Sequence, residues 1–243
     1  MNLVSLGWDD AVAAQFQPYA ISDFQPARVA CAHKHACDVY TSNGLLPAAC
    51  TGKMLHDALT HADLPVVGDW VAVRPRPGES QLDIHAVLPR RTKFSRRAAG
   101  VRDQEQVLAS NIDTLFLVSS LDDNYNLRRI ERYLLLAWES GARPIVVLNK
   151  SDLHPDPSAA QAEVAAVAPG ATVLALSAMV GSGIEALNPW LQPGQTVALL
   201  GSSGVGKSTL INCLLGEDIQ DTGDISDINH KGRHTTTRRE FSL

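Results

Sequence analysis

Residues 197–216, VALLGSSGVGKSTLINCLLG, hold the spacing Gly201-x4-Gly206-Lys207-Ser208. Small residues let the backbone curl so that several N–H groups point at one phosphate, and the helix expected after the loop adds positive potential. Lys207 is spaced to reach the β- and γ-phosphates of a nucleotide and to serve chemistry there, and the Ser208 hydroxyl is spaced to bind Mg²⁺. The pattern predicts a nucleotide site whose phosphate-binding residues are Gly201, Ser202, Ser203, Gly204, Val205, Gly206, Lys207, Ser208 and Thr209.

Residues 149–152 read Asn-Lys-Ser-Asp after an apolar run, and this second pattern predicts which base is bound. Guanine presents two adjacent donors, N1–H and the 2-amino group, and the Asp152 carboxylate can accept from both. The Asn149 amide can donate to guanine O6 or N7, and the Lys150 stem can cover the flat face of the base. A Ser-Ala pair after another strand-like run can offer a backbone N–H to guanine O6. The ligand predicted is GTP or GDP, and the base-binding residues are Asn149, Lys150, Ser151, Asp152, Ser177 and Ala178.

The segments that must position these residues alternate between strand and helix. Residues 127–140 repeat apolar side chains at intervals of three and four, which is typical of a helix, and Gly141 lies just past their end. Apolar strands that alternate with helices indicate a parallel sheet covered on both faces, the α/β class. The strand-like runs are 113–120, 144–149, 172–177 and 195–200, and the helix after the phosphate loop is expected over 206–215.

The first ninety residues show a β pattern instead. Short strand-like runs are separated by Gly, Pro, Asn and Asp, and five such strands suit a small barrel, of which the OB-fold is the commonest kind. Residues 8–16 space Trp8, Val12 and Phe16 like a helix that packs on the barrel. The strand-like runs are 27–31, 37–42, 45–50, 68–75 and 82–89, and a basic segment, PRRTKFSRRAAGVRDQE, follows over 89–105.

The motifs stand in an unusual order along the chain. An ordinary GTPase has the phosphate loop first and Asn-Lys-x-Asp later, whereas here residues 149–152 precede the loop at 201–206. Domain termini commonly lie close together, so a chain can be joined there and reopened elsewhere while the sheet is retained. We expect a circularly permuted P-loop domain whose site survives because the same strand ends converge.

This order, after a small barrel, resembles that of the circularly permuted, ribosome-associated GTPases known as RsgA or YjeQ. The resemblance covers essentially the whole chain, and few other proteins share the motif order. The matching segments are LGW, VGDWVAV (67–73), RRTKFSRR (90–97), LASNIDTLFLV (108–118), RRIERYL (128–134), VVLNKSDL (146–153), GSSGVGKSTLIN (201–212) and KGRHTTTRRE (231–240).

The resemblance implies a GTPase that acts late in assembly of the small ribosomal subunit, with the bound subunit stimulating slow hydrolysis. It implies that an OB-fold barrel over 1–89 contacts ribosomal RNA and that a basic linker over 90–107 leads to a permuted G domain over 108–243. One threonine of residues 235–237 would belong to the switch segment that senses the γ-phosphate, and Thr236 is taken as the candidate. The alternative is a GTP-dependent RNA- or ribosome-binding module with little turnover of its own.

The chain departs from the family pattern at its end. It stops at RREFSL, before the Asp-x-x-Gly element and the zinc domain with three Cys and one His that the family carries. We therefore expect nucleotide binding without multiple turnover, and we expect Zn²⁺ only in the domain that this chain lacks. The cysteines contain no C-x-x-C pair and no zinc-type spacing, which favours buried thiols in a reducing cytosol. These cysteines are Cys31, Cys37, Cys50 and Cys213.

Composition excludes some classes of function. The 243 residues carry a formal net charge of −5, which argues against nucleic-acid binding through overall charge but not through local basic patches. No stretch approaches the roughly 18 apolar residues of a membrane span, and the start MNLVSLGWDD lacks the pattern of a signal peptide. A cytoplasmic monomer is expected.

Overall fold

The structure is a computed structural model that describes residues 1–20, 23–33, 36–97 and 105–216. The chain divides into two compact units. Unit 1 contains Met1–Ile112 and Pro193–Thr196, and unit 2 contains Asp113–Gln192 and the described residues from Val197 onward. Each unit is described by itself.

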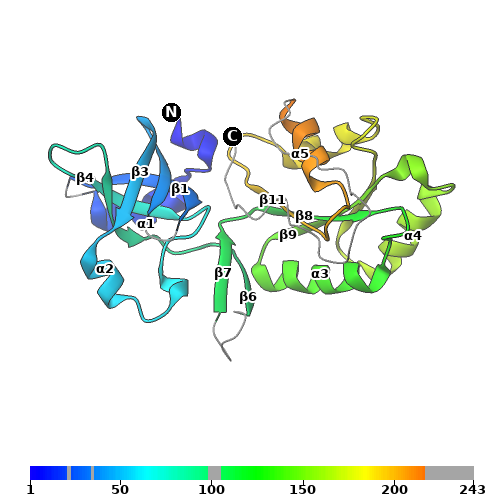
Figure 1. Ribbon diagram of the computed structural model, residues 1–243, viewed down its shortest axis with the longest axis horizontal. Helices are drawn as coiled ribbons and strands as arrows, with labels where there is room; N and C mark the ends of the chain where they lie inside the picture. Colours follow the sequence, from blue (N-terminus) through cyan, green and yellow to red (C-terminus); the bar gives the residue numbers. More distant parts are fainter. Residues whose placement is uncertain (21–22, 34–35, 98–104, 217–243) are drawn as a thin grey trace, which may run out of the picture. The chain divides into compact units, whose positions relative to one another are not determined.

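Unit 1 is built on a closed five-stranded barrel with the strand order β1-β2-β3-β5-β4 (Figure 1). Neighbouring strands are antiparallel except β3 and β5, which are parallel. The predicted small barrel is confirmed, and its interior holds a cluster of buried aliphatic side chains. The strands are β1 (Gln25–Ala32), β2 (Cys37–Thr41), β3 (Gly44–Cys50), β4 (Trp70–Pro75) and β5 (Leu82–Val87).

The predicted N-terminal helix forms as α1 (Asp10–Phe16). It starts where it does because the Asp9 side chain accepts a hydrogen bond from the Val12 N–H at 2.9 Å, which satisfies an unpaired donor of the first turn. Its apolar face packs on the barrel, where the rings of Trp8 and Trp70 lie 5.0 Å apart edge to face. The other helical segments of this unit are η1 (Leu3–Leu6), η2 (Gln17–Tyr19), α2 (Gly52–Asp57) and η3 (His61–Asp63).

The basic segment treated as a linker contains regular structure. β6 (Lys93–Arg97) and β7 (Glu105–Ser110) form an antiparallel pair. The segment is tied to the barrel unit by Arg90, which donates to both oxygens of the Asp69 carboxylate at 2.8 and 2.7 Å. A fully buried carboxylate needs such a partner. The described part of the predicted basic linker thus contains a strand pair, which the charge pattern did not predict.

Unit 2 contains a four-stranded parallel sheet with the order β10-β9-β8-β11. Alternate residues of its central strands point to opposite faces, and almost all of them are buried, as expected for strands covered on both sides. Among the described residues β11 is an edge of this sheet. The strands are β8 (Thr114–Ser120), β9 (Arg143–Asn149), β10 (Thr172–Ala175) and β11 (Val197–Leu200).

Helices cover both faces of the sheet, with α3 and α5 on opposite sides (Figure 1). α3 (Leu127–Ser140) is capped by Asn126, whose side chain accepts from the Arg129 N–H at 2.9 Å, and it ends at Gly141 with φ +82°. The predicted apolar stripe of α3 is buried at Ile130, Leu134 and Ala137, whereas Trp138 is exposed. The remaining helical segments are η4 (Ser151–Leu153), α4 (Pro157–Val167), η5 (Ile184–Trp190) and α5 (Lys207–Leu215).

Candidate nucleotide-binding site

The phosphate-binding loop joins the end of β11 to the start of α5. Gly204 and Gly206 have φ of +80° and +91°, a left-handed conformation that favours glycine, and α5 begins at Lys207. The first N–H groups of a helix have no partner inside it, so they point at whatever occupies the loop. The structure therefore places the predicted loop between a strand end and a helix start, which is the context that phosphate binding requires.

Two glycines of this loop lie so close to neighbouring groups that a side chain at either position would collide with them. A Cβ on Gly201 would lie 2.4 Å from the Val118 carbonyl oxygen of β8. A Cβ on Gly206 would lie 2.3 Å from Nδ2 of Asn149. The glycines thus let the phosphate loop approach the end of β9, where the base-binding residues were predicted.

Lys207 is half-buried at the start of α5. Its Nζ donates to the carbonyl oxygens of Gly201 and Ser202 at 3.0 and 2.7 Å. Burial lowers the pKa of Lys207 below its usual value, because the ammonium loses water without gaining an anion. An anionic phosphate in the loop would supply the missing charge. Ser208 and Thr209, in the same helical turn, are also half-buried.

Asn149 joins three loops of the site. It ends β9, is 2 % exposed, and donates from Nδ2 to the Val205 carbonyl oxygen at 2.9 Å. Its Oδ1 accepts from the Ala178 N–H at 3.0 Å. One buried amide thus connects the phosphate loop, the Asn-Lys-Ser-Asp loop and the Ser-Ala loop. The sequence prediction gave this amide to guanine itself. In the structure its oxygen and one of its two N–H donors are bonded to the protein, and donation to guanine by the amide nitrogen stays a prediction.

The Ser177-Ala178 pair lies beside the phosphate loop, as predicted, but its N–H groups are already used. The Ser177 N–H donates to the Ser182 carbonyl oxygen at 2.9 Å, and the Ala178 N–H is the donor to Asn149. Both residues are buried. The pair therefore shapes the loop, and the predicted donation to guanine O6 is not available from these two N–H groups in this arrangement.

Lys150 is held by a residue that sequence reasoning missed. It has φ of +60°, and its Nζ donates to Asp122 Oδ2 at 2.8 Å. Burial acts to raise the pKa of Asp122, but hydrogen bonds from Lys150, Ser120 and the Asn124 N–H outweigh it, so the pKa lies below its usual value. An ionised Asp122 therefore fixes the position of the Lys150 ammonium.

The β8–α3 loop also contacts the phosphate loop. The Asn124 side-chain nitrogen lies 3.3 Å from the Ser203 carbonyl oxygen and 3.4 Å from Ser202 Oγ. The Asn124 Oδ1 accepts from Arg129 at 2.8 Å. The only signal for these residues in the sequence was their place just after a buried strand, where parallel-sheet proteins keep their sites.

Asp152 is exposed on η4, next to Ser151, whose N–H donates to the Leu176 carbonyl oxygen at 3.1 Å. The backbone of this loop is therefore fixed to the strand region that leads to Ser177, while the Asp152 carboxylate faces solvent. Thr236, the predicted switch residue, lies outside the described residues.

The fold and the site define a class: a P-loop nucleotide-binding domain of the GTPase type in circularly permuted order. The chain belongs to the RsgA GTPase family, because the family model described as "RsgA GTPase" matches residues 87–243. A protein from Opitutus terrae named small ribosomal subunit biogenesis GTPase RsgA is 61 % identical over 249 residues, covering 99 % of this chain and 68 % of that protein. A protein of the same name from Methanosarcina acetivorans is 42 % identical over 237 residues, covering 98 % and 63 %.

Solved structures agree with this assignment. The crystal structure of YjeQ from Thermotoga maritima has a TM-score of 0.63 and 26 % identity, covering 79 % of this chain and 65 % of that one. YloQ, described as a circularly permuted GTPase, has a TM-score of 0.57 at 20 % identity over 78 % of this chain and 63 % of its own, a likeness of fold. The chain spans about two thirds of the length of the curated relatives that it matches.

No helix in the described part of the chain has both the length and the apolarity needed to cross a bilayer.

Proposed function

We propose that this chain binds GTP and GDP with Mg²⁺ and acts as a GTP-hydrolysing factor in late maturation of the small ribosomal subunit, with hydrolysis stimulated by that subunit. The names of its relatives support the ribosomal role. The observation that carries the nucleotide site is the Asn149 amide, which joins the phosphate loop to the loop of residues 149–152. We further propose that the protein is a cytoplasmic monomer. Its parts would be a barrel over 1–89, a basic segment over 90–107 and a G domain over 108–243.

At the base, the proposal gives each residue a separate task. Asp152, exposed and next to the anchored Ser151, accepts hydrogen bonds from the two donors of guanine. Lys150, held by Asp122, covers the face of the base with its methylene stem. Asn149 is a positioning residue that keeps these groups beside the phosphate loop.

At the phosphates, the proposal gives Lys207 the main charge. Its Nζ now bonds to two loop carbonyls, and a bound triphosphate offers a stronger, anionic partner that removes the cost of its burial. The half-buried Ser208 hydroxyl, one residue later in the first turn of α5, would hold Mg²⁺. When bound, Mg²⁺ neutralises charge on the phosphate oxygens. Thr236 is kept as the proposed switch residue.

For the ribosomal contact, the proposal uses the basic strand pair of unit 1. Lys93 and Arg96 are exposed on β6, where they hydrogen-bond to Glu105 and Gln106 of β7. Exposed cations on a strand can bind the phosphates of ribosomal RNA. Such a contact is compatible with the negative net charge of the chain, because the positive charge is concentrated locally on β6.

The first experiment titrates a fluorescent guanosine diphosphate into the chain and into Asp152→Asn, with xanthosine diphosphate as the second ligand. The variant presents donors to the donors of guanine, so its affinity for GDP should fall by at least about 100-fold while xanthosine diphosphate gains affinity. The matched control is Asp123→Asn, which alters a different exposed carboxylate, one that lies on the β8–α3 loop. Unchanged GDP affinity in Asp152→Asn would contradict the proposed base site.

The second experiment measures phosphate release by the chain alone and with small ribosomal subunits. Stimulated multiple turnover supports the enzyme, whereas nucleotide-dependent binding to the subunit without turnover supports the alternative of a GTP-dependent binding module. Turnover by the chain alone gives the baseline rate. A rate that the small subunit leaves unchanged would contradict the proposed stimulation.

A further inference from the structure

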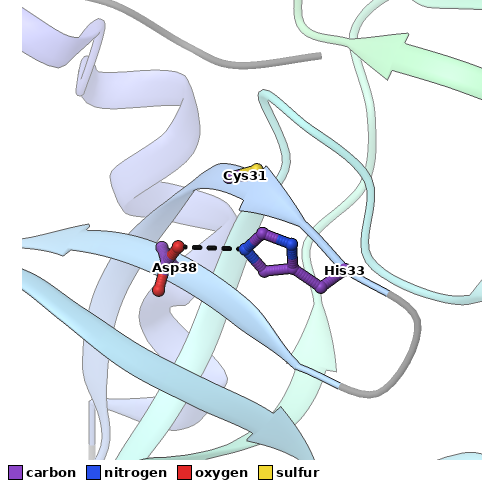
Figure 2. A group of neighbouring side chains, drawn as sticks. All are labelled: Cys31, His33 and Asp38. Atoms are coloured by element: carbon purple, nitrogen blue, oxygen red, sulfur yellow. Dashed lines mark hydrogen bonds and ion pairs between the residues drawn. The ribbon is translucent and has the colours of Figure 1, made fainter. Parts of the chain in front are cut away.

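We propose that a divalent ion of the zinc class binds to unit 1 at the end of the β1–β2 pair, through Cys31, His33 and Asp38. This site lies outside the nucleotide site and does not depend on the proposed function. Figure 2 shows Cys31 on β1, Asp38 on the neighbouring strand β2 and His33 just after the end of β1, with the His33 ring hydrogen-bonded to Asp38.

A β-bulge brings the thiol to this place. Val29 pairs with Val39, but Cys31 pairs with Asp38, so one extra residue lies between the two pairs on β1. Without the bulge, Cys31 would share a face with Val29, which is inside the barrel. Bulges redirect side chains in this way. Cys31 consequently shares a face with Asp38, because directly opposite residues of a strand pair point to the same side.

His33, the residue after β1, supplies the imidazole. Its N–H donates to the Ala36 carbonyl oxygen at 2.8 Å. His33 Nε2 lies 3.1 Å from Asp38 Oδ2, and all three candidate ligand atoms lie within 4.8 Å of one another. Zinc bonds of about 2.0–2.3 Å separate tetrahedral ligand atoms by roughly 3.3–3.8 Å. Small rotations of the exposed His33 and the half-buried Asp38 side chains can bring the three ligand atoms to these separations.

The donor set points to zinc rather than to magnesium or calcium. A thiolate, an imidazole and a carboxylate are the three kinds of zinc ligand, whereas the harder ions take oxygen ligands. The side chains of His33 and Asp38 are 46 % and 35 % exposed, so a water molecule can reach the fourth position of a tetrahedral ion. The site would hold an exchangeable ion, and binding would release the proton of the Cys31 thiol.

Two other groups of the chain serve as internal comparisons. Cys37 points into the barrel interior, where burial raises the pKa of its thiol to about 12, and it is not among the three converging residues. His56 and Asp57 form a histidine–carboxylate pair at 3.2 Å, more exposed than His33 and Asp38. They are not part of a metal-ligand group in the described residues.

The test titrates Co²⁺ into the 243-residue chain after removal of metals with a chelator. Thiolate ligation gives an intense sulfur-to-cobalt charge-transfer band, which Mg²⁺-type oxygen sites cannot produce, and added Zn²⁺ should abolish the band by displacement. Loss of an outer-shell partner already weakens metal sites by about 10–100-fold. Removing a direct ligand by His33→Gln or Asp38→Asn should therefore weaken Co²⁺ binding by at least about tenfold, and Cys31→Ser should remove the band.

The matched controls are His56→Gln and Cys213→Ser, which change an exposed imidazole and an exposed thiol elsewhere. Both should leave the band unchanged. Cys31 is buried, so folding of Cys31→Ser is checked by circular dichroism. The variants at the exposed His33 and the half-buried Asp38 keep the test decisive if Cys31→Ser misfolds. A folded parent chain without the band would overturn the proposal, and so would a band insensitive to His33→Gln and Asp38→Asn.

Discussion

A single side-chain amide performs the main structural task of the nucleotide site. Both polar atoms of Asn149 are bonded to backbone groups of other loops, and the side chain is almost completely buried. Buried polar groups that lose their partner cost about 1–3 kcal/mol each. The position of the phosphate loop relative to residues 150–152 therefore depends on this residue more than on any contact that the sequence suggested.

Asn149→Ala should remove the nucleotide site and lower stability. It leaves the Val205 carbonyl and the Ala178 N–H without partners, so we expect a loss of about 2–5 kcal/mol in the free energy of unfolding. Urea unfolding measures the stability, and GDP titration measures the affinity, which should fall at least about tenfold. Asn188→Ala, at an exposed asparagine of the same unit, is the control. Equal behaviour of the two variants would show that Asn149 does not join the loops.

Gly206→Ala separates backbone strain from steric collision. Gly206 and Gly216 both have positive φ, but a Cβ on Gly206 would meet Asn149 Nδ2 at 2.3 Å, and a Cβ on Gly216 would meet nothing within 4 Å. A left-handed alanine costs about 1–2 kcal/mol at either position. Gly206→Ala should lose considerably more stability and lose GDP binding, whereas Gly216→Ala should keep its affinity. Nucleotide binding by Gly206→Ala equal to that of the parent would argue against the close approach.

At the scale of elements, strand order explains why motifs far apart in the sequence form one site. β8 and β9 are parallel neighbours, β11 lies on the other side of β8, and Ser120 is paired with Asn149 at their carboxyl ends. The carboxyl ends of parallel strands share one edge, where loops of different origin meet. The permuted chain order does not affect this arrangement, because the sheet depends on strand positions and not on where the chain is opened.

In unit 1 one of the contacts that hold the β6–β7 segment is a buried ion pair between Arg90 and Asp69. Asp69 is fully buried and Arg90 is 14 % exposed at its side chain, and Arg90 also donates to the Ala62 and Leu64 carbonyls at 2.6 and 2.9 Å. Arg90→Ala leaves the Asp69 carboxylate buried without its cation, which should cost about 3–5 kcal/mol.

The comparison for Arg90→Ala is Lys93→Ala, which removes an exposed ion pair with Glu105 from the same segment. Exposed pairs contribute about 0–1 kcal/mol, so this variant should unfold almost like the parent. Thermal and urea unfolding of unit 1 measure both changes. Similar losses in the two variants would show that the burial of Asp69 is not what makes the Arg90 pair important.

At the scale of the whole molecule, the negative net charge is compatible with the proposed RNA contact, because basic residues are concentrated on one strand, β6. If the basic strand β6 binds phosphates of the small ribosomal subunit, association should weaken as salt rises, with a slope of about −0.9 per phosphate for duplex-like sites. Lys93→Ala combined with Arg96→Ala should reduce the steepness by up to about 2 in a plot of log affinity against log salt. Arg128→Ala combined with Arg132→Ala, on exposed positions of α3, is the charge-matched control.

A parallel loss of slope in both double variants would indicate that only total charge matters, and an unchanged slope in the first would place the RNA contact elsewhere. Either result leaves the nucleotide site untouched, because none of the four residues belongs to it. Binding to purified small subunits at several salt concentrations measures the slopes.

Many features of the fold and of the candidate site could be predicted from patterns that are local along the chain. The phosphate loop, residues 149–152 and the strand runs of the barrel and sheet are each short, and their physics depends on neighbours in sequence: small residues allow a tight loop, and apolar periodicity selects strand or helix. The reversed order of the motifs is also a property of the sequence alone, and it led to the permuted G domain. The pairing of β6 with β7 did not follow, because the charge pattern of that segment says nothing of strand partners.

Only the tertiary structure decided which groups meet. Asn149 bonds to Val205, 56 residues away, and Lys150 bonds to Asp122, 28 residues away, so neither partner is contained in a local pattern. The Cys31 thiol lies beside Asp38 because a one-residue bulge reverses the face that regular alternation assigns to it. Residue types and spacing determine what chemistry a chain can perform, but register and loop approach, set by packing of the whole fold, determine which side chains are used for it.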